Sequence, residues 1–210
     1  MPRLVLATAN PGKAADMRHL LGGGFDLVPL PADAPDVEET GTTFAENAIL
    51  KARAAAALMR LPAIGDDSGL EVDALAGAPG VYSARYAADS VEDGADRATV
   101  DAANNRKLLA ALATVPSGRR TARFHSVLAF VDGDTLLVAH GTCAGWVLEA
   151  PRGTGGFGYD PLFFCPELGL TFGEATIEEK GRVSHRARAA AALAPRLAAH
   201  FGVANPADSR

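Results

Sequence analysis

Two adjacent carboxylates, Asp66 and Asp67, constrain this chain more than any other feature of its sequence. They lie in residues 65–69, which read Gly-Asp-Asp-Ser-Gly, directly after the apolar run 61–64 that predicts a buried strand. An ionised carboxylate resists burial unless a positive partner compensates its charge. Hard cations such as Mg²⁺ take oxygen ligands, and the flanking glycines allow a close approach of backbone and ligand. These residues therefore favour a metal-phosphate or metal-nucleotide site at a strand end over the alternative of a polar turn.

Length and composition indicate a globular protein with a buried core. The chain has 210 residues, of which 48% are hydrophobic and 21% charged, as is typical of folded proteins. We predict one domain over 1–203, undivided or with two lobes, and a loose polar tail over 204–210. Because no apolar run is long enough to cross a bilayer and no signal peptide precedes the first strand, we expect a cytoplasmic protein without a membrane partner.

Charge and cysteine content exclude several classes of function. The net charge of −5 argues against a nucleic-acid polymer as partner, because polymer binding depends on many Lys and Arg contacts. A single nucleotide needs only a local basic patch. The two cysteines, Cys143 and Cys165, offer neither a zinc spacing nor a disulfide framework, and we interpret both as small buried hydrophobes.

Strand and helix patterns alternate along the chain. Asn10 before Pro11, Thr43 three residues before Glu46, and Ser184 are typical of helix N-caps. Asp132-Gly133 predicts a hairpin turn. The pattern favours an α/β or α+β domain with a mixed sheet. We expect strands at 3–7, 25–29, 61–64, 122–131 and 135–147, and helices at 11–21, 43–60, 93–113 and 184–200.

The segment 8–13 combines a strand end, a polar turn and the first turn of a helix. Amide groups at a helix N-terminus favour an anion, and a lysine there adds a full charge. An ordinary capped helix with a solvated lysine is equally compatible with this spacing, which differs from that of a Walker A loop. The candidate phosphate-binding residues are Thr8, Ala9, Asn10, Pro11, Gly12 and Lys13.

Acidic and basic residues near the second helix extend this picture. Glu39 precedes the helix and is placed to reach a metal, and Lys51 lies two turns inside it. Taken alone, a solvated acidic loop with a surface lysine explains both residues better. At Asp66-Asp67, a carboxylate can bind Mg²⁺, act as a general base toward water, or do both.

Two further segments suit a nucleotide base. Residues 153–161 are rich in glycine and contain Phe157 and Tyr159, either of which can stack on a flat ring. Residues 180–188 form a local basic cluster in an acidic chain, which suggests an anionic partner. A flexible loop and a basic helix surface are the structural alternatives. Together with the acids and lysines, these segments supply what a magnesium-bound nucleoside triphosphate requires.

The motifs resemble those of the inosine triphosphate pyrophosphatase family, also called dITP/XTP pyrophosphatases. The resemblance covers residues 4–201 with all motifs in the same order. Its main departures from the family pattern are at Ala9, where many relatives have glycine, and at Gly65, where many have alanine. The motifs that carry it are Thr8–Lys13, Phe44–Ala52, Asp66–Leu70, Gly77–Arg85, Gly155–Asp160 and Ser184–Arg186.

The resemblance implies an α/β fold, elongated and two-lobed, with a long mixed sheet flanked by helices and an active-site groove between the lobes. It implies a homodimer that hydrolyses ITP, dITP and XTP to the monophosphate and pyrophosphate with Mg²⁺ as cofactor. Asp67 would be the catalytic residue and, with Glu39, a metal ligand. The residues that would contact the substrate are Thr8, Ala9, Asn10, Pro11, Gly12, Lys13, Lys51, Ser68, Phe157, Gly158, Tyr159, Asp160, Lys180, His185 and Arg186.

Base selection would follow from hydrogen-bond matching. Hypoxanthine and xanthine present a 6-oxo acceptor, which donors on His185 or Arg186 would bind and which adenine lacks. The rejection of guanine does not follow from the sequence. Three alternatives stay open: a pyrophosphatase for pyrimidine or modified triphosphates, a nucleotide sensor without catalysis, and a purely structural dimer.

Overall fold

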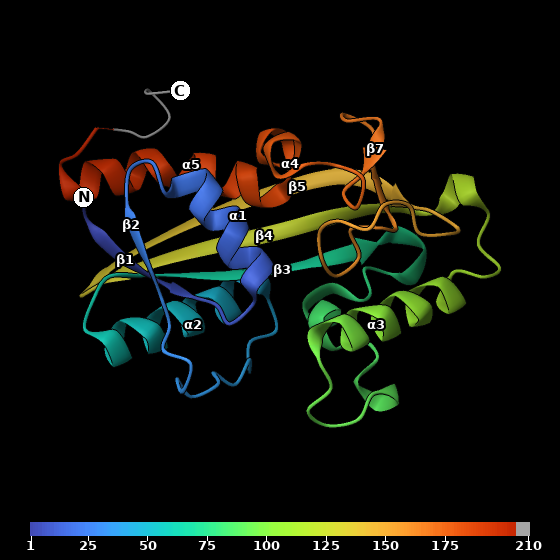
Figure 1. Ribbon diagram of the computed structural model, residues 1–210, viewed down its shortest axis with the longest axis horizontal. Coiled ribbons are helices and arrows are strands. Elements are labelled where there is room, and N and C mark those ends of the chain that lie inside the picture. The colour runs from blue at the N-terminus through green and yellow to red at the C-terminus, as the bar shows by residue number, and fades with distance from the viewer. Residues whose placement is uncertain (205–210) are drawn as a thin grey trace. The chain divides into compact units, whose positions relative to one another are not determined.

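The computed structural model describes residues 1–204 and shows an α/β protein (Figure 1). All but the first residue of the predicted tail 204–210 lies outside this range. Within the described range, the strands form one seven-stranded sheet in the order β2-β1-β3-β4-β5-β6-β7. Its main elements are β1 (Arg3–Ala7), α1 (Pro11–Leu21), β2 (Asp26–Pro29), α2 (Phe44–Met59), β3 (Ala63–Val72), α3 (Arg97–Ala111), β4 (Thr121–Asp132), β5 (Thr135–Val147), β6 (Phe163–Cys165), β7 (Leu170–Thr171), α4 (Ile177–Val183) and α5 (His185–Phe201).

The sheet is mixed, as predicted. Strand β1 pairs in parallel with β2 and β3, whereas β6 pairs antiparallel with both β5 and β7. The predicted helix caps are confirmed: Asn10 accepts from two amides of α1, Thr43 and Glu46 form a capping box, and Ser184 caps α5. Local side-chain chemistry therefore fixes where these three helices begin.

The described residues divide into two compact units. Unit 1 comprises 1–67, 126–142 and 184–204, and unit 2 comprises Ser68–His125 and Cys143–Val183. Strands β3, β4 and β5 each contribute residues to both units. Each unit has its own hydrophobic core, so each has the packing that a folded unit requires.

Unit 1 buries both faces of its strands. In β1, Leu4 and Leu6 belong to the core that includes α1 and α5, while Val5 and Ala7 belong to the core under α2. This alternation follows from the period of two in a strand. Figure 1 shows α1 and α5 on one side of these strands and α2 on the other. Small residues on α2 allow it to lie close to β3, and at Gly65 an added Cβ would overlap the Ala48 carbonyl.

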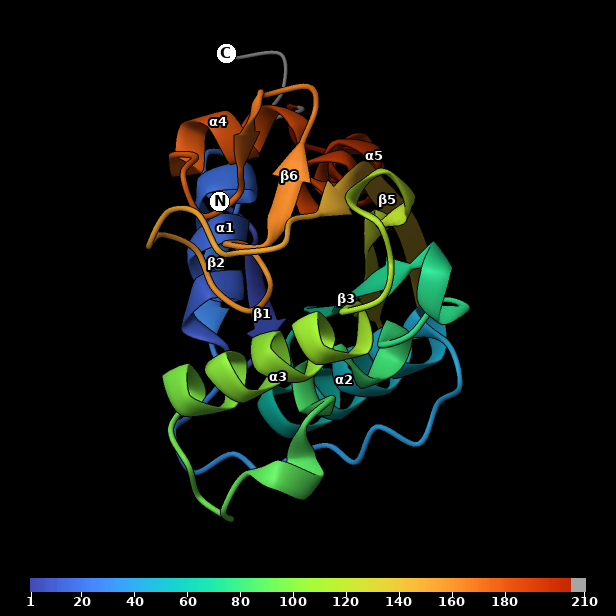
Figure 2. The same ribbon diagram turned by 90° about the vertical axis from the view of Figure 1, so that its right-hand side faces the viewer.

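Unit 2 has a core built largely from aromatic side chains. Phe124 of β4 packs 4.7 Å from Phe163 of β6 and stacks 5.8 Å from Phe172, measured between ring centroids. Helix α3 adds Leu108 and Leu112 to this cluster, and it faces the viewer in Figure 2. Offset and tilted ring pairs of this kind stabilise a core beyond the area that they bury.

One predicted strand was wrong in length. The strand predicted at 61–64 is β3, which continues through Asp66 and Asp67 as far as Val72. The two carboxylates therefore lie inside a strand, not at its end or in a turn. The strand can continue because each carboxylate meets basic partners, Arg186 and Lys13 at one and Lys51 at the other, which offset the cost of burying charge.

We predict that Gly141→Ala lowers the free energy of unfolding by about 1–3 kcal/mol, the usual cost of overpacking. A Cβ at Gly141 of β5 would overlap the His185 carbonyl and the Ala189 amide of α5, and backbone atoms cannot move aside as a flexible side chain can. Urea denaturation measures the change. Gly23→Ala is the matched control, because a Cβ at Gly23 meets no atom within 4 Å. Equal stability of the two variants would contradict this account of the packing.

Candidate active site

Asp66 and Asp67 point to opposite faces of β3. Asp66 contacts residues of α1 and α5, and Asp67 contacts residues of α2. Adjacent residues of a strand must diverge in this way. The structure thus gives the two carboxylates separate environments, which the sequence alone did not distinguish.

Asp66 is held in a buried network of charges. Its Oδ2 accepts from Arg186 Nε at 2.6 Å, and its Oδ1 accepts from the Ser126 hydroxyl at 3.4 Å. Arg186 also donates to Asp16 Oδ2 at 2.7 Å, and its side chain is only 2% exposed. Burial alone would raise the pKa of Asp66, but Arg186 and then Lys13 outweigh it and hold the pKa well below its ordinary value. Asp66 therefore stays ionised at neutral pH.

Asp67 lies beside Lys51 and Glu39. Lys51 Nζ is 2.7 Å from Asp67 Oδ1 and 2.7 Å from Glu39 Oε1. Burial raises the pKa of Asp67, Lys51 opposes the rise, and Glu39 adds to it. Burial would lower the pKa of Lys51, but Asp67 and Glu39 raise it. The pKa of Asp67 is thus raised, which is the direction that favours a general base.

Asn47 orients Asp67 from the preceding turn of α2. Its Nδ2 donates to Asp67 Oδ2 at 3.4 Å, and its Oδ1 accepts from the Gly41 amide at 2.9 Å. Asn47 stands in the motif Phe44–Ala52 but was not among the predicted site residues. The available signal was a polar amide one helical turn before Lys51 in an alanine-rich helix, a position that faces the same way.

Two lysines converge on the backbone beside these carboxylates. Lys13 Nζ and Lys51 Nζ both donate to the Asp66 carbonyl, at 3.3 and 3.2 Å. Burial lowers the pKa of Lys13 to about 8, with Lys51 and Arg186 adding to the effect and Asp66 opposing it. Two ammonium groups held together at the N-terminal end of α1 form a place where an anion with several charges would be stabilised.

The carboxylates of unit 1 fit a hard cation. Glu39 and Asp67 contact the same ammonium, so their oxygens lie within twice 2.7 Å of each other. In residues 1–204, no three His, Cys, Asp or Glu side chains already surround a common point. Two protein carboxylates are nevertheless typical of Mg²⁺ sites, in which substrate phosphates and water supply the other ligands.

The predicted base-binding loop lies in unit 2 and is tied together by Asp160. Asp160 Oδ2 accepts from the Phe157 amide at 3.0 Å and from Lys180 Nζ at 2.7 Å. Lys180 also lies over the Phe157 ring, 5.3 Å from its centroid. Gly156 adopts a φ of +72°, and a Cβ there would overlap Asp160. The loop therefore combines an aromatic ring, a buried ion pair and a turn that only glycine fits.

Tyr159 does not present its ring as a stacking surface. Its ring belongs to the hydrophobic core of unit 2 and the residue is 4% exposed. Its hydroxyl donates to the Ser83 carbonyl at 2.9 Å, and burial, with Tyr86 and Asp101, raises its pKa. Of the two aromatic residues predicted to stack on a base, only Phe157 stays a candidate, and it is half-buried.

The remaining predicted residues fall into both units. Thr8 supports the cap of α1, since its Oγ1 accepts from the Asn10 amide at 3.1 Å. Ser68 directly follows Asp67 and is half-buried. His185 is buried at the start of α5 in unit 1, next to Arg186. The roles predicted for these side chains in substrate binding stay predictions.

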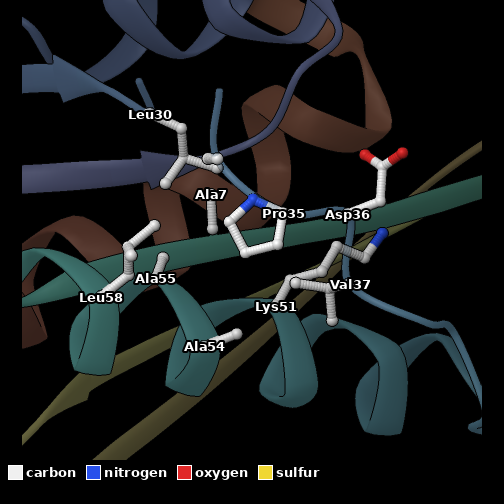
Figure 3. Close-up of a pocket in the computed structure, with 10 residues that line it drawn as sticks. Ala7, Leu30, Pro35, Asp36, Val37, Lys51, Ala54, Ala55 and Leu58 are labelled. Carbon is white, nitrogen blue, oxygen red and sulfur yellow. The ribbon is translucent and has the colours of Figure 1, made fainter. Parts of the chain in front are cut away.

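An apolar cavity of about 260 Å³ lies beside Lys51 (Figure 3). The figure shows the aliphatic stem of Lys51 along it and Asp36 at its edge. Because its walls are mostly apolar, we assign the cavity no part in phosphate binding. It is lined by Ala7, Leu30, Ala34, Pro35, Asp36, Val37, Lys51, Ala54, Ala55 and Leu58.

This α/β protein with its lysine–carboxylate site is similar to proteins of one known family. The model of the Ham1 family matches residues 4–196. A dITP/XTP pyrophosphatase of Symbiobacterium thermophilum is 52% identical over 94% of this chain and 95% of its own. One of Mannheimia succiniciproducens is 50% identical over 94% and 98%. A solved HAM1 protein of Coxiella burnetii has a TM-score of 0.80 and 41% identity, covering 95% of this chain and 100% of its own.

The chain belongs to the Ham1 family. The predicted family is therefore confirmed, and so is the predicted α/β fold with a mixed sheet flanked by helices. Among residues 1–204, none of the helices combines the length and the apolar character needed to cross a bilayer.

We predict that Asp66→Asn lowers the free energy of unfolding by about 3–5 kcal/mol at pH 7, because it leaves the buried Arg186 guanidinium without one of its two partners. Folding lowers the pKa of Asp66 below its ordinary value of 3.8, so its contribution is present above pH 3.8 and is lost as the pH falls further. The difference between wild type and variant should therefore shrink in acid.

Denaturation across pH measures this effect. Asp26→Asn is the control, because it removes a carboxylate from an exposed ion pair with Arg3, a kind of pair worth little. A variant at Asp66 as stable as wild type at pH 7 would show that the network is not needed for folding.

Proposed function

We propose that the protein hydrolyses non-standard purine nucleoside triphosphates, namely ITP, dITP and XTP, to the monophosphate and pyrophosphate. Such an activity would remove these nucleotides from the cellular pool. The observation that carries the proposal is the convergence of Lys13 and Lys51 beside Asp67, whose pKa is raised. The names of the relatives in Symbiobacterium and Mannheimia support the substrate class.

The residues of unit 1 suit phosphoryl transfer. Lys13 and Lys51 would neutralise phosphate oxygens and the charge that develops on the leaving pyrophosphate. Asp67 would orient a water molecule and accept its proton as the oxygen attacks the α-phosphorus. Asp66 would stay ionised and hold Arg186 and Lys13 in place. In this arrangement the protein supplies mainly position and charge.

We propose that the activity depends on Mg²⁺. Glu39 and Asp67 would hold the ion, and Lys51 would give up its contact with them to bind phosphate oxygens. When bound, the ion would supply positive charge to the triphosphate. The support is the pair of carboxylates that already converges on one cationic group.

The loop of unit 2 suits the base. Phe157 would stack on the ring, and Lys180 and Asp160 would offer a donor and an acceptor to its edge. For His185, which lies in unit 1, the donor role toward the 6-oxo group stays a prediction. For Arg186, its two ion pairs with Asp66 and Asp16 support a positioning role better than direct contact with the base. The homodimer stays a prediction from the resemblance, and the cytoplasmic location stays a prediction from the sequence.

A triphosphate panel tests the proposed function. We expect ITP, dITP or XTP to give monophosphate and pyrophosphate in the presence of Mg²⁺, with far higher kcat/KM than ATP or pyrimidine triphosphates and no turnover in EDTA. Asp67→Asn should lower kcat at least about 10²-fold, the usual contribution of a general base, and leave the unfolding curve cooperative. Diphosphate as the product, or near-normal turnover by the variant, would refute the proposal.

A second prediction concerns pH. Lys13, with a pKa of about 8, binds phosphate only when protonated, so kcat/KM should fall as the pH rises through 8. The pKa of Lys51 is raised, so Lys51 keeps its charge in this range. Lys13→Arg retains its charge at all of these pH values, and its profile should lack the fall even if its absolute rate is lower. An identical alkaline fall in this variant would exclude Lys13 as the titrating group.

A further inference from the structure

Two side chains of helix α3 hold both backbone polar groups of Gly158, which lies in the predicted base-binding loop. The Gly158 amide donates to Asp101 Oδ2 at 2.7 Å, and the Gly158 carbonyl accepts from Asn105 Nδ2 at 2.8 Å. Asp101 and Asn105 are one helical turn apart, so both side chains reach from the same face of α3. These contacts lie wholly within unit 2.

The two side chains are themselves fixed. Asn105 Nδ2 also donates to the Asp101 carbonyl at 2.9 Å, and Arg97 lies 3.0 Å from Asp101 Oδ1. The Asp101 side chain is 14% exposed, so its charge-assisted hydrogen bond to Gly158 is largely shielded from water. A rigid helix thus positions both polar groups of one loop residue.

The loop needs such a constraint because of its composition. Gly155, Gly156 and Gly158 flank Phe157, and glycine loses more conformational freedom on ordering than any other residue. Gly158 has a φ of +60°. On its other side, Asp160 holds the Phe157 amide and Lys180. Phe157 therefore lies between two fixed points, one supplied by α3 and one by Asp160.

We propose that Asp101 and Asn105 are positioning residues that pre-organise the loop 155–160 and so set the selectivity for the base, an inference that rests on the proposed function. Neither residue has to touch the substrate. Pre-organisation removes the cost of ordering a flexible loop when a ligand binds. Loss of the contact should therefore weaken recognition of the base and leave recognition of the triphosphate chain unchanged.

Three variants test the proposal. Asp101→Ala removes the acceptor for the Gly158 amide, Asp101→Asn keeps an acceptor oxygen, and Asn105→Ala removes the donor to the Gly158 carbonyl. We expect Asp101→Ala and Asn105→Ala to raise KM for the preferred triphosphate by about tenfold or more, with a smaller effect on kcat and a reduced preference over ATP. Asp101→Asn should keep KM and the preference over ATP close to those of wild type. Arg106→Ala, at an exposed position of the same helix, should match wild type.

A binding measurement separates positioning from general damage. Inhibition by inorganic tripolyphosphate reports on the phosphate residues of unit 1, and calorimetric titration with inosine monophosphate reports on the base. The proposal predicts that Asp101→Ala weakens the binding of inosine monophosphate and leaves inhibition by tripolyphosphate unchanged. Equal losses in both, or wild-type KM and selectivity in Asp101→Ala and Asn105→Ala, would overturn it.

The same measurements keep the two proposals distinct. If wild-type protein releases no pyrophosphate from any triphosphate, the proposed function fails. The binding of inosine monophosphate then decides the role of α3: weaker binding by Asp101→Ala and Asn105→Ala supports it, and wild-type binding by both refutes it.

Discussion

The buried ion pair between Asp66 and Arg186 is the interaction on which the rest of unit 1 depends. Two adjacent carboxylates in a strand must point to opposite faces, and here one of them enters the packed layer between β3, α1 and α5. A buried carboxylate without a partner costs several kcal/mol. Arg186 removes that cost, and Asp16 balances the second half of its guanidinium. Strand β3 can therefore continue, and it carries Asp67 to the face of α2.

The same network separates the properties of the two carboxylates. The pKa of Asp66 is lowered and that of Asp67 is raised, although they are neighbours in the chain. Environments that shift the pKa values of two acids in opposite directions are typical of sites where one acid is structural and the other exchanges a proton. Lys13, with its lowered pKa, is the complementary case: a polyphosphate would stabilise the charged form that burial disfavours.

Contacts between residues close in the chain could be predicted from the sequence, and ion pairs between residues far apart in the chain could not. The caps at Asn10, Thr43 and Ser184 depend on neighbours a few residues away, so their patterns were informative. The length of β3 depends on Arg186, which lies 120 residues from Asp66. Without that partner, Gly-Asp-Asp-Ser-Gly has the composition of a turn. The resemblance to a family identified the acids and lysines, but not Asn47 or Asp16, which act on them from α2 and α1.

In both units, side chains of a helix hold a glycine-containing segment in place. Each places glycine in or beside a segment predicted to meet the metal or the substrate, and each fixes that segment with an amide or carboxylate from a helix. In unit 1, Asn47 holds the Gly41 amide and Asp67; in unit 2, Asp101 and Asn105 hold Gly158. Glycine gives close approach but no rigidity, so the rigidity must come from elsewhere. Substitutions on α2 and α3 can therefore change binding without altering any residue that touches the substrate.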